Sequence, residues 1–119
     1  MPLTELTRMT AVEAVRRLKA RELQPADLID AAMARMDEVE PAVNALPTRC
    51  PERARAAAVE LARRGGDADA PGWLAGLPVA IKDLLPVAGV RSTQGSPIFA
   101  DHVPDRSDIV VETLERNGA

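Results

Sequence analysis

The segment "GGDADAPGWLAG", residues 65–76, separates two parts of the chain whose hydrophobic residues follow different patterns. Before it, apolar residues recur at helical spacing. After it, Pro78 to Ile81 is a continuous apolar run of strand length, typical of a strand buried on both faces. Because glycine and proline interrupt regular structure, we expect this segment to connect two differently organised parts. The pattern predicts three helices, then a strand, a loop and a last helix.

Capping and proline signals locate the first two helices. The sequence Thr10-Ala11-Val12-Glu13 is a capping box and predicts a helix over residues 10–22. Pro25 suits the first turn of a second helix, because a backbone N–H at that position would have no helical partner. Apolar residues form one stripe along this second helix, and Pro41 is expected to end it.

The remaining elements are predicted from breaker residues and apolar spacing. A third helix begins at Pro51, runs through the Ala-rich sequence and ends at Gly65-Gly66, where glycine can adopt a left-handed cap. Residues 43–46 are predicted to be a short extended segment, and residues 87–92 a second short strand. A last helix is predicted over Asp108 to Arg116, because apolar residues face one side of it and either Ser107 or Asp105 can cap its start.

Composition limits the classes of function. The chain has 119 residues, of which 46% are hydrophobic, and this suits one modest domain or part of one. A net charge of -3 and 2% aromatic residues provide neither a basic stripe nor stacking platforms, so we expect no direct nucleic-acid partner. No apolar stretch approaches the roughly 20 residues of a membrane span, and residues 1–22 lack a signal-peptide pattern. We therefore expect a cytoplasmic protein, and its single cysteine, Cys50, excludes an internal disulfide.

Lys82 is the residue that suggests a specific chemistry. It is one of only two lysines in the chain, and it directly follows the apolar run. A lysine at the end of a strand usually extends its amine into water. Alternatively, apolar walls desolvate the amine, which favours its neutral form and lets it act as a general base, a role closed to arginine. From the residues alone, both interpretations stay open.

Other catalytic patterns are absent. No Ser lies three residues before a Lys, and the chain has neither a Gly-x-Ser-x-Gly elbow nor a phosphate-binding Gly-x-x-x-x-Gly-Lys loop. His102 is the single histidine, so a zinc site built on paired histidines is excluded, and no metal or cofactor is expected. Asp83 is expected to be a loop or helix-cap carboxylate. Gly95 and Ser96 suit an ordinary turn, or a turn that presents amides and a hydroxyl to a pocket.

Residues 76–119 resemble the start of the amidase signature family. The residues that carry the resemblance are "GLPVAIKD", a Val-Ala-Gly turn, a Gly-Ser loop preceded by Ser92-Thr93 where a typical member has two threonines, and a helix ending in Gly-Ala. The segment "VNALPTRCPERARAAA" is also similar to that family. The resemblance implies an α/β fold in which N-terminal helices pack on the beginning of a mixed β-sheet, an incomplete amidase-signature fold. It divides the chain into a helical layer at 1–66, a linker at 67–75 and the start of the core at 76–119.

The resemblance also implies a Ser-cisSer-Lys hydrolase of carbon-nitrogen bonds, in which Lys82 is the general base. The two serines of that family belong to a Gly- and Ser-rich stretch downstream of the lysine. Ser92, Ser96 and Ser107 do not stand in such a stretch. We therefore expect an N-terminal fragment that is inactive alone, whose complete form acts on a small-molecule amide. Because an incomplete sheet exposes edges and an apolar face, association with a complementary chain or self-association is expected.

Three alternatives stay open at this point. One is a fragment similar to the A subunit of a tRNA-dependent amidotransferase, which shares the signature. Another is a non-catalytic interaction module that docks on a partner, and the last is a decayed product without function. The sequence identifies neither the substrate nor the oligomeric state.

Overall fold

The computed structural model describes residues 1–119 and contains helices joined by long irregular segments, with no strand. Its elements are α1 (Leu3–Leu6), α2 (Ala11–Lys19), α3 (Pro25–Val43), α4 (Pro51–Arg64), the short 3-10 helix η1 (Pro97–Phe99) and α5 (Ile109–Arg116). The helices predicted from Thr10, Pro25, Pro51 and Asp108 are therefore confirmed, whereas α1 and η1 were not predicted.

The predicted α/β fold, with N-terminal helices on the beginning of a mixed β-sheet, is wrong for this chain. Residues 78–81, 87–92 and 43–46 form no strand. The backbone N–H groups of residues 79–84 donate no hydrogen bond within the chain. An apolar run favours an extended backbone, but a strand also needs a neighbour at hydrogen-bonding distance. The sequence pattern was strand-like, and residues 1–119 place no second strand beside it.

Local signals explain most helix boundaries. The hydroxyl of Thr10 accepts a hydrogen bond from the N–H of Glu13 at 3.2 Å and caps α2, whereas the Glu13 carboxylate binds Arg16 and Arg17, so half of the predicted capping box forms. Helix α2 ends at Lys19, before the predicted residue 22, and Arg21 adopts a left-handed conformation with φ 59°. At α5, the carboxylate of Asp108 accepts from the N–H of Val110 at 2.8 Å.

Helix α3 does not end at Pro41 as predicted but continues to Val43. A proline removes one backbone donor and crowds the carbonyl four residues earlier, which disturbs the turn before it but leaves the residues after it able to stay helical. The helix ends at Asn44, which adopts a left-handed conformation with φ 50° and whose N–H donates to the carbonyl of Glu40 at 2.8 Å. Asparagine tolerates this conformation better than most residues other than glycine.

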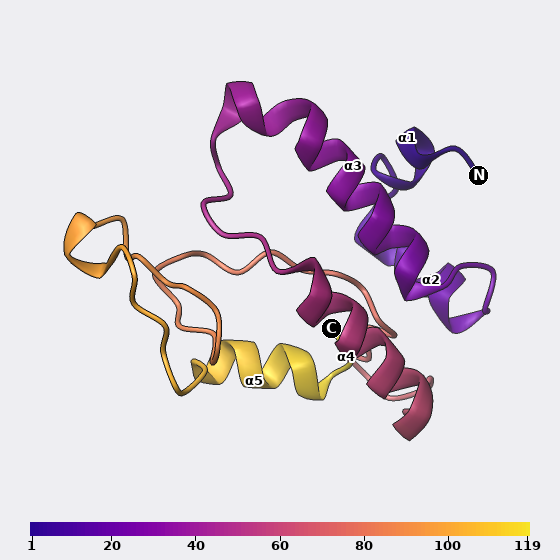
Figure 1. Ribbon diagram of the computed structural model, residues 1–119. Coiled ribbons are helices and arrows are strands. Elements are labelled where there is room, and N and C mark those ends of the chain that lie inside the picture. The colour runs from indigo at the N-terminus through magenta and orange to yellow at the C-terminus, as the bar shows by residue number, and fades with distance from the viewer.

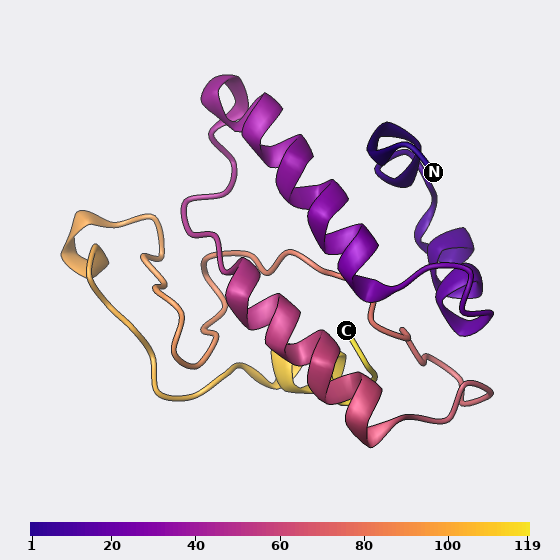
Figure 2. The ribbon, with the colours of Figure 1, turned by 45° about the vertical axis from the view of Figure 1, so that its right-hand side comes forward.

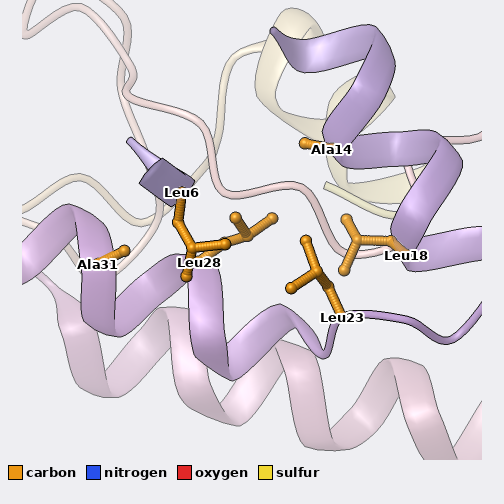
Figure 3. Packing of buried hydrophobic residues seen from close by; sticks show 6 residues of the cluster. All are labelled: Leu6, Ala14, Leu18, Leu23, Leu28 and Ala31. Atoms are coloured by element: carbon orange, nitrogen blue, oxygen red, sulfur yellow. The ribbon is translucent and has the colours of Figure 1, made fainter. Parts of the chain in front are cut away.

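The buried hydrophobic cluster lies between α1, α2 and α3. Figure 3 shows its members pointing toward one another; they are Leu6, Ala14, Leu18, Leu23, Leu28 and Ala31. Only 12 of the 119 residues are buried, so this aliphatic core is small, as the low aromatic content leads one to expect. Helix α4 contributes no buried residue. None of the helices has both the length and the apolar character needed to cross a membrane.

The other helices surround this cluster incompletely. Figures 1 and 2 show α3 and α4 side by side, with α1 and α2 beyond α3 and with α5 next to α4. The guanidinium of Arg53 on α4 donates to the carboxylate of Glu115 on α5 at 2.8 Å. The loop that contains η1 extends away from all the helices in both views. The irregular segment after residue 76 runs past α3 and α4 and carries Lys82.

Trp73 ties the segment after α4 to the C-terminal end of the chain. A Cβ atom at Gly66 would lie 2.0 Å from the Trp73 ring, and one at Gly118 would lie 2.9 Å from it. These two positions therefore need glycine, because the indole ring approaches the backbone closely. The N–H of Leu74 donates to the carbonyl of Asn117 at 2.7 Å, in the same contact. The C-terminal end of α5 is held against residues 73–76 in this way.

Candidate functional site

Lys82 lies on the edge of a large open hollow in the structure. The hollow has a volume of about 1030 Å³ and most of its lining residues are hydrophobic. Lys82 is exposed, and its amine makes no hydrogen bond or ion pair within the chain. Its amine therefore reaches water at the rim of an apolar surface, with no wall of this chain closed over it.

The hollow collects side chains from three helices and the segment after residue 76. Helix α3 contributes part of the apolar stripe that the sequence pattern predicted, and α4 and α5 contribute further residues to the lining. Its hydrophobic lining includes Ile29, Met33, Met36, Ala54, Ala58, Leu61, Leu77, Ile81, Leu85, Val111 and Leu114. Ile29 and Val111 are buried, and the other residues of this list are partly exposed at the open space.

Asp83 is the most connected polar residue beside Lys82. Its carboxylate accepts a hydrogen bond from the N–H of Thr93 at 3.0 Å and another from the Thr93 hydroxyl. Its backbone carbonyl accepts from the hydroxyl of Ser92 at 2.8 Å, and Ser92 is buried, with 4% of its surface exposed. These bonds join the Lys82-Asp83 pair to the turn at residues 92–95.

The hydrogen bonds of this turn also set the charge state of Asp83. The Thr93 hydroxyl lowers the pKa of the Asp83 carboxyl below its ordinary value, the Thr93 N–H lowers it further, and the charge of Arg91 adds a smaller effect. Donors stabilise the ionised form of a carboxyl group. Asp83 is thus a carboxylate at neutral pH, as expected for the loop carboxylate that the sequence suggested.

Each serine of the chain has a structural contact. Besides the bond from Ser92 to Asp83, the hydroxyl of Ser107 accepts from the N–H of Ala88 at 2.9 Å. The hydroxyl of Ser96 accepts from the N–H of Ile98 at 3.3 Å and caps η1. No hydrogen bond joins any of these hydroxyls to Lys82. The three serines therefore stabilise turns and are not arranged as a nucleophile beside a base.

None of the other candidates from the sequence makes a hydrogen bond to Lys82, although Cys50 and Gly95 line the same hollow. Gly95 lines the hollow and Ser96 does not, so the two residues do not present one combined site. His102 is exposed and its ring meets Phe99 edge-on, with ring centres 5.9 Å apart. Cys50 is exposed and precedes α4. The structure contains no group of three or more His, Cys, Asp or Glu side chains that could hold a metal ion.

The role of Asp83 as a connecting residue was not predicted. The sequence contains a signal for it, because turn-forming residues such as Pro86 and Gly89 lie between Asp83 and Ser92-Thr93 and can bring the two ends together. That signal is weak without the structure, since many loops have such residues and few close on themselves. The two hydroxyls at 92 and 93 are the more specific part of it.

Comparison with known proteins identifies the family. The sequence profile of the family described as Amidase matches residues 27–119. The A subunit of glutamyl-tRNA(Gln) amidotransferase from Carboxydothermus hydrogenoformans is 36% identical over 115 residues, which are 97% of this chain and 24% of that protein. The proteins of the same name from Geobacter metallireducens and from Bradyrhizobium sp. (strain BTAi1) are 40% and 38% identical. These matches cover 97% and 98% of this chain and 24% and 23% of those proteins.

The chain thus spans about a quarter of the length of the curated relatives it matches. The resemblance stated from residues 76–119 is confirmed, and the match extends it to nearly the whole chain. These relatives are of the kind that the sequence left as an alternative, the A subunit of a tRNA-dependent amidotransferase. Because the family profile covers most of its residues, the chain belongs to the amidase signature family.

Proposed function

We propose that this chain is the lysine-bearing N-terminal part of an amidase-family protein that resembles the A subunit of glutamyl-tRNA(Gln) amidotransferase. The observation that carries the proposal is the match to such proteins over 97% of this chain. In the complete protein, residues 76–119 begin the core, residues 1–66 form a helical layer on it, and residues 67–75 connect the two. Its substrate is a small-molecule amide, and a complementary chain is its partner.

Lys82 is the general base in this proposal. The neutral amine removes the proton of a bridging serine, which in turn removes the proton of the serine nucleophile, and both serines belong to polypeptide other than residues 1–119. The oxygen of the nucleophile then forms a bond to the amide carbonyl carbon, the carbon-nitrogen bond breaks, and the proton leaves with the departing amine. Water hydrolyses the resulting ester and restores the serine. A lysine base without its serine gives little catalysis, so the 119-residue chain is inactive alone.

The hollow supports this proposal in a second way. We assign it to the remaining part of the amidase domain, because the relatives contain about three times as much further sequence and the lining is apolar. When that polypeptide covers the hollow, it removes water from the side of Lys82. Desolvation disfavours the charged form of an amine, and the neutral form is the one that acts as a general base.

An amidase that needs no tRNA is the second candidate. The family profile that matches residues 27–119 carries the description Amidase and does not itself distinguish the two activities. They differ in the fate of the released nitrogen, which an amidotransferase passes to an acceptor and an amidase releases. Transfer to glutamyl-tRNA is therefore the measurement that separates them.

The experiment compares this chain with the full polypeptide that its gene encodes, each as wild type, Lys82→Ala and Lys19→Ala. Lys19 is the matched control, because it is the other lysine of the chain and is exposed on α2. Ammonia release is measured on a panel of small carboxamides, and transfer to glutamyl-tRNA is measured with and without co-purifying chains. We expect activity in the full polypeptide alone, abolished by Lys82→Ala and unchanged by Lys19→Ala.

Each other outcome has a definite meaning. Amide hydrolysis without transfer, in the presence of every co-purifying chain, favours the amidase. Full activity of the Lys82→Ala variant would overturn the assignment of the base. If the full polypeptide acts on no amide and transfers nothing, the catalytic proposal fails, and the interaction module or the decayed product replaces it.

A further inference from the structure

We propose that Asp83 is a positioning residue which, through Ser92 and Thr93, fixes the orientation of Lys82 at the rim of the hollow. This inference rests on the proposed function of Lys82 as a base. Asp83 does not touch the substrate in this proposal. It acts on the backbone from which the Lys82 side chain extends.

The hydrogen bonds around Asp83 hold it at several points. Its two carboxylate oxygens bind the N–H and the hydroxyl of Thr93, and its carbonyl binds the hydroxyl of Ser92. These partners lie nine and ten residues further along the chain. One hydrogen bond leaves rotation about its axis free, whereas bonds to both the side chain and the carbonyl fix the orientation of the residue. The Thr93 hydroxyl also accepts from the N–H of Gly95 at 3.3 Å, which holds the turn itself.

The carbonyl group of Lys82 is held by a further hydrogen bond on the same, C-terminal side. It accepts this bond from the N–H of Leu85 at 2.9 Å, so residues 82–85 form a turn. The peptide group between Lys82 and Asp83 therefore lies between two anchored points. By contrast, the N–H groups of residues 79–84 donate no hydrogen bond, so nothing on the N-terminal side of Lys82 orders its backbone in this way. The anchoring of Lys82 depends on Asp83 and on the turn that follows.

The turn at 92–95 is itself attached to the rest of the loop. The N–H of Ser92 donates to the carbonyl of His102 at 2.9 Å, and the N–H of Gly89 donates to the carbonyl of Pro104 at 2.9 Å. The N–H of Asp108 donates to the carbonyl of Pro86 at 2.9 Å, which attaches this loop to the start of α5. The loop is thus a connected frame, and Asp83 is the residue that joins the frame to Lys82.

The hydrogen bonds between Asp83 and Thr93 predict which substitutions keep the positioning role. At position 93, serine keeps both the N–H and the hydroxyl, and valine keeps the shape and removes the hydroxyl. At position 83, asparagine keeps one acceptor and gains a donor, so it can still pair with both groups of Thr93. Alanine at position 83 removes both side-chain bonds. A positioning role tolerates Asp83→Asn and Thr93→Ser and does not tolerate Asp83→Ala or Thr93→Val.

The test uses the full polypeptide and its amide hydrolysis, with kcat, KM and the pH profile measured for each variant. We expect Asp83→Ala to lower kcat by about 10- to 100-fold with KM changed less than about 2-fold, because a base displaced by about 1 Å loses activity on this scale. Asp83→Asn and Thr93→Ser are expected to keep most of kcat. We expect Thr93→Val to lower kcat as well, and this variant replaces Asp83→Ala if Asp83→Ala does not fold.

Asp108→Ala is the control for a merely structural effect. It removes one side-chain hydrogen bond, at the start of α5, and leaves the Asp83 contacts in place. We expect it to lower the thermal midpoint and keep kcat, whereas Asp83→Ala lowers kcat even at temperatures where both variants are fully folded. Equal loss of kcat in Asp108→Ala and Asp83→Ala would overturn the positioning role.

The two proposals fail in different ways. If Lys82→Ala is inactive while Asp83→Ala and Thr93→Val keep wild-type kcat, the positioning proposal is wrong and the proposed function stands. If Lys82→Ala keeps its activity, the proposed function is wrong whatever Asp83 does. If Asp83→Asn loses as much kcat as Asp83→Ala, the charge of Asp83 and not its hydrogen-bonding geometry is required, and the proposal is again overturned.

Discussion

At the scale of single residues, neighbouring side chains at positions 82 and 83 have opposite surroundings. Lys82 is exposed at the rim of the hollow without a partner, and Asp83 is bound by Thr93 and Ser92. A carboxylate can accept several hydrogen bonds at once, and this makes aspartate suited to closing a loop. Lys82 thus presents an amine without a partner, whereas the Asp83 carboxylate is hydrogen-bonded to Thr93.

The first prediction concerns the ionisation of Asp83 in this chain. Thr93→Val removes the hydroxyl that has the largest effect, so it should raise the pKa of the Asp83 carboxyl toward its ordinary value. Because the folded-state pKa of Asp83 lies below that of the unfolded chain, its contribution to stability is present above about pH 4 and is lost as the pH falls through the folded pKa. Carboxyl-carbon NMR titration measures the shift, and Thr93→Ser is the control that should preserve it.

A second residue-scale prediction concerns Glu13. Hydrogen bonds from Arg16 and then Arg17 lower the pKa of Glu13 to about 2. The Arg16 bonds are exposed and the Arg17 bond is partly buried, so solvent and salt weaken chiefly the Arg16 bonds. We expect the pKa of Glu13, followed by NMR, to rise toward its ordinary value in about 1 M salt and in Arg16→Gln. A pKa that does not respond to either change would contradict this origin of the shift.

At the scale of elements, capping residues set most helix ends, and contacts between segments set the rest. Thr10 and Asp108 cap α2 and α5 by accepting backbone N–H bonds. The end of α3 shows the limit of such signals, because Pro41 was the obvious stop and Asn44 is the actual one. A proline signal acts on its own turn, whereas the position of the end also depends on which later residue can adopt a left-handed conformation.

The cap of α2 gives the next prediction. Thr10→Ala removes the acceptor for the Glu13 N–H and should lower the free energy of unfolding by about 1 kcal/mol, as helix caps commonly do. Chemical denaturation followed by circular dichroism measures it. Thr4→Ala is the control, because the Thr4 hydroxyl makes no hydrogen bond. A change within about 0.3 kcal/mol of that control would mean that the cap contributes nothing.

The contact of Trp73 with Gly66 gives a prediction about packing between segments. Gly66→Ala places a methyl group within 2.0 Å of the indole ring, so the ring must move. We expect a red-shifted tryptophan emission and a loss of roughly 1 to 3 kcal/mol, typical of overpacking. Trp73 is the single tryptophan, so the emission reports this site alone. In a Trp73→Ala background, the same substitution should have little effect on stability.

At the scale of the whole molecule, the buried cluster is small because many of the hydrophobic residues line the open hollow instead of a closed core. The buried cluster lies on one side of α3, and the hydrophobic lining of the hollow lies on its other side and on α4 and α5. Exposed apolar surface of this extent is typical of an interface. Helices α1, α2 and α3 therefore enclose a packed hydrophobic cluster, whereas the apolar surface formed by α3, α4 and α5 is not covered by this chain.

The last prediction concerns this uncovered surface. The 119-residue chain should bind an apolar fluorescent dye and associate in sedimentation experiments, because water-exposed apolar area favours contact with other apolar groups. Met36→Gln, in the hollow, should reduce both, whereas Val12→Gln, which is 83% exposed on α2 and outside the hollow, should reduce neither. If both variants lower dye binding equally, the hollow is not the site of association.

The sequence by itself determined the helices from Pro25 and Pro51, the cap at Thr10, the family, and Lys82 as the candidate base, whereas the last helix is capped by Asp108 and not by Ser107 or Asp105. These features depend on neighbouring residues or on a contiguous motif, and such information is local. The tertiary structure decided that residues 78–81 pair with nothing, that Asp83 is bound by the turn ten residues later, and that Lys82 faces an open hollow. Each of these depends on segments distant in sequence, because strand pairing, loop closure and burial need a partner in space that no local pattern specifies.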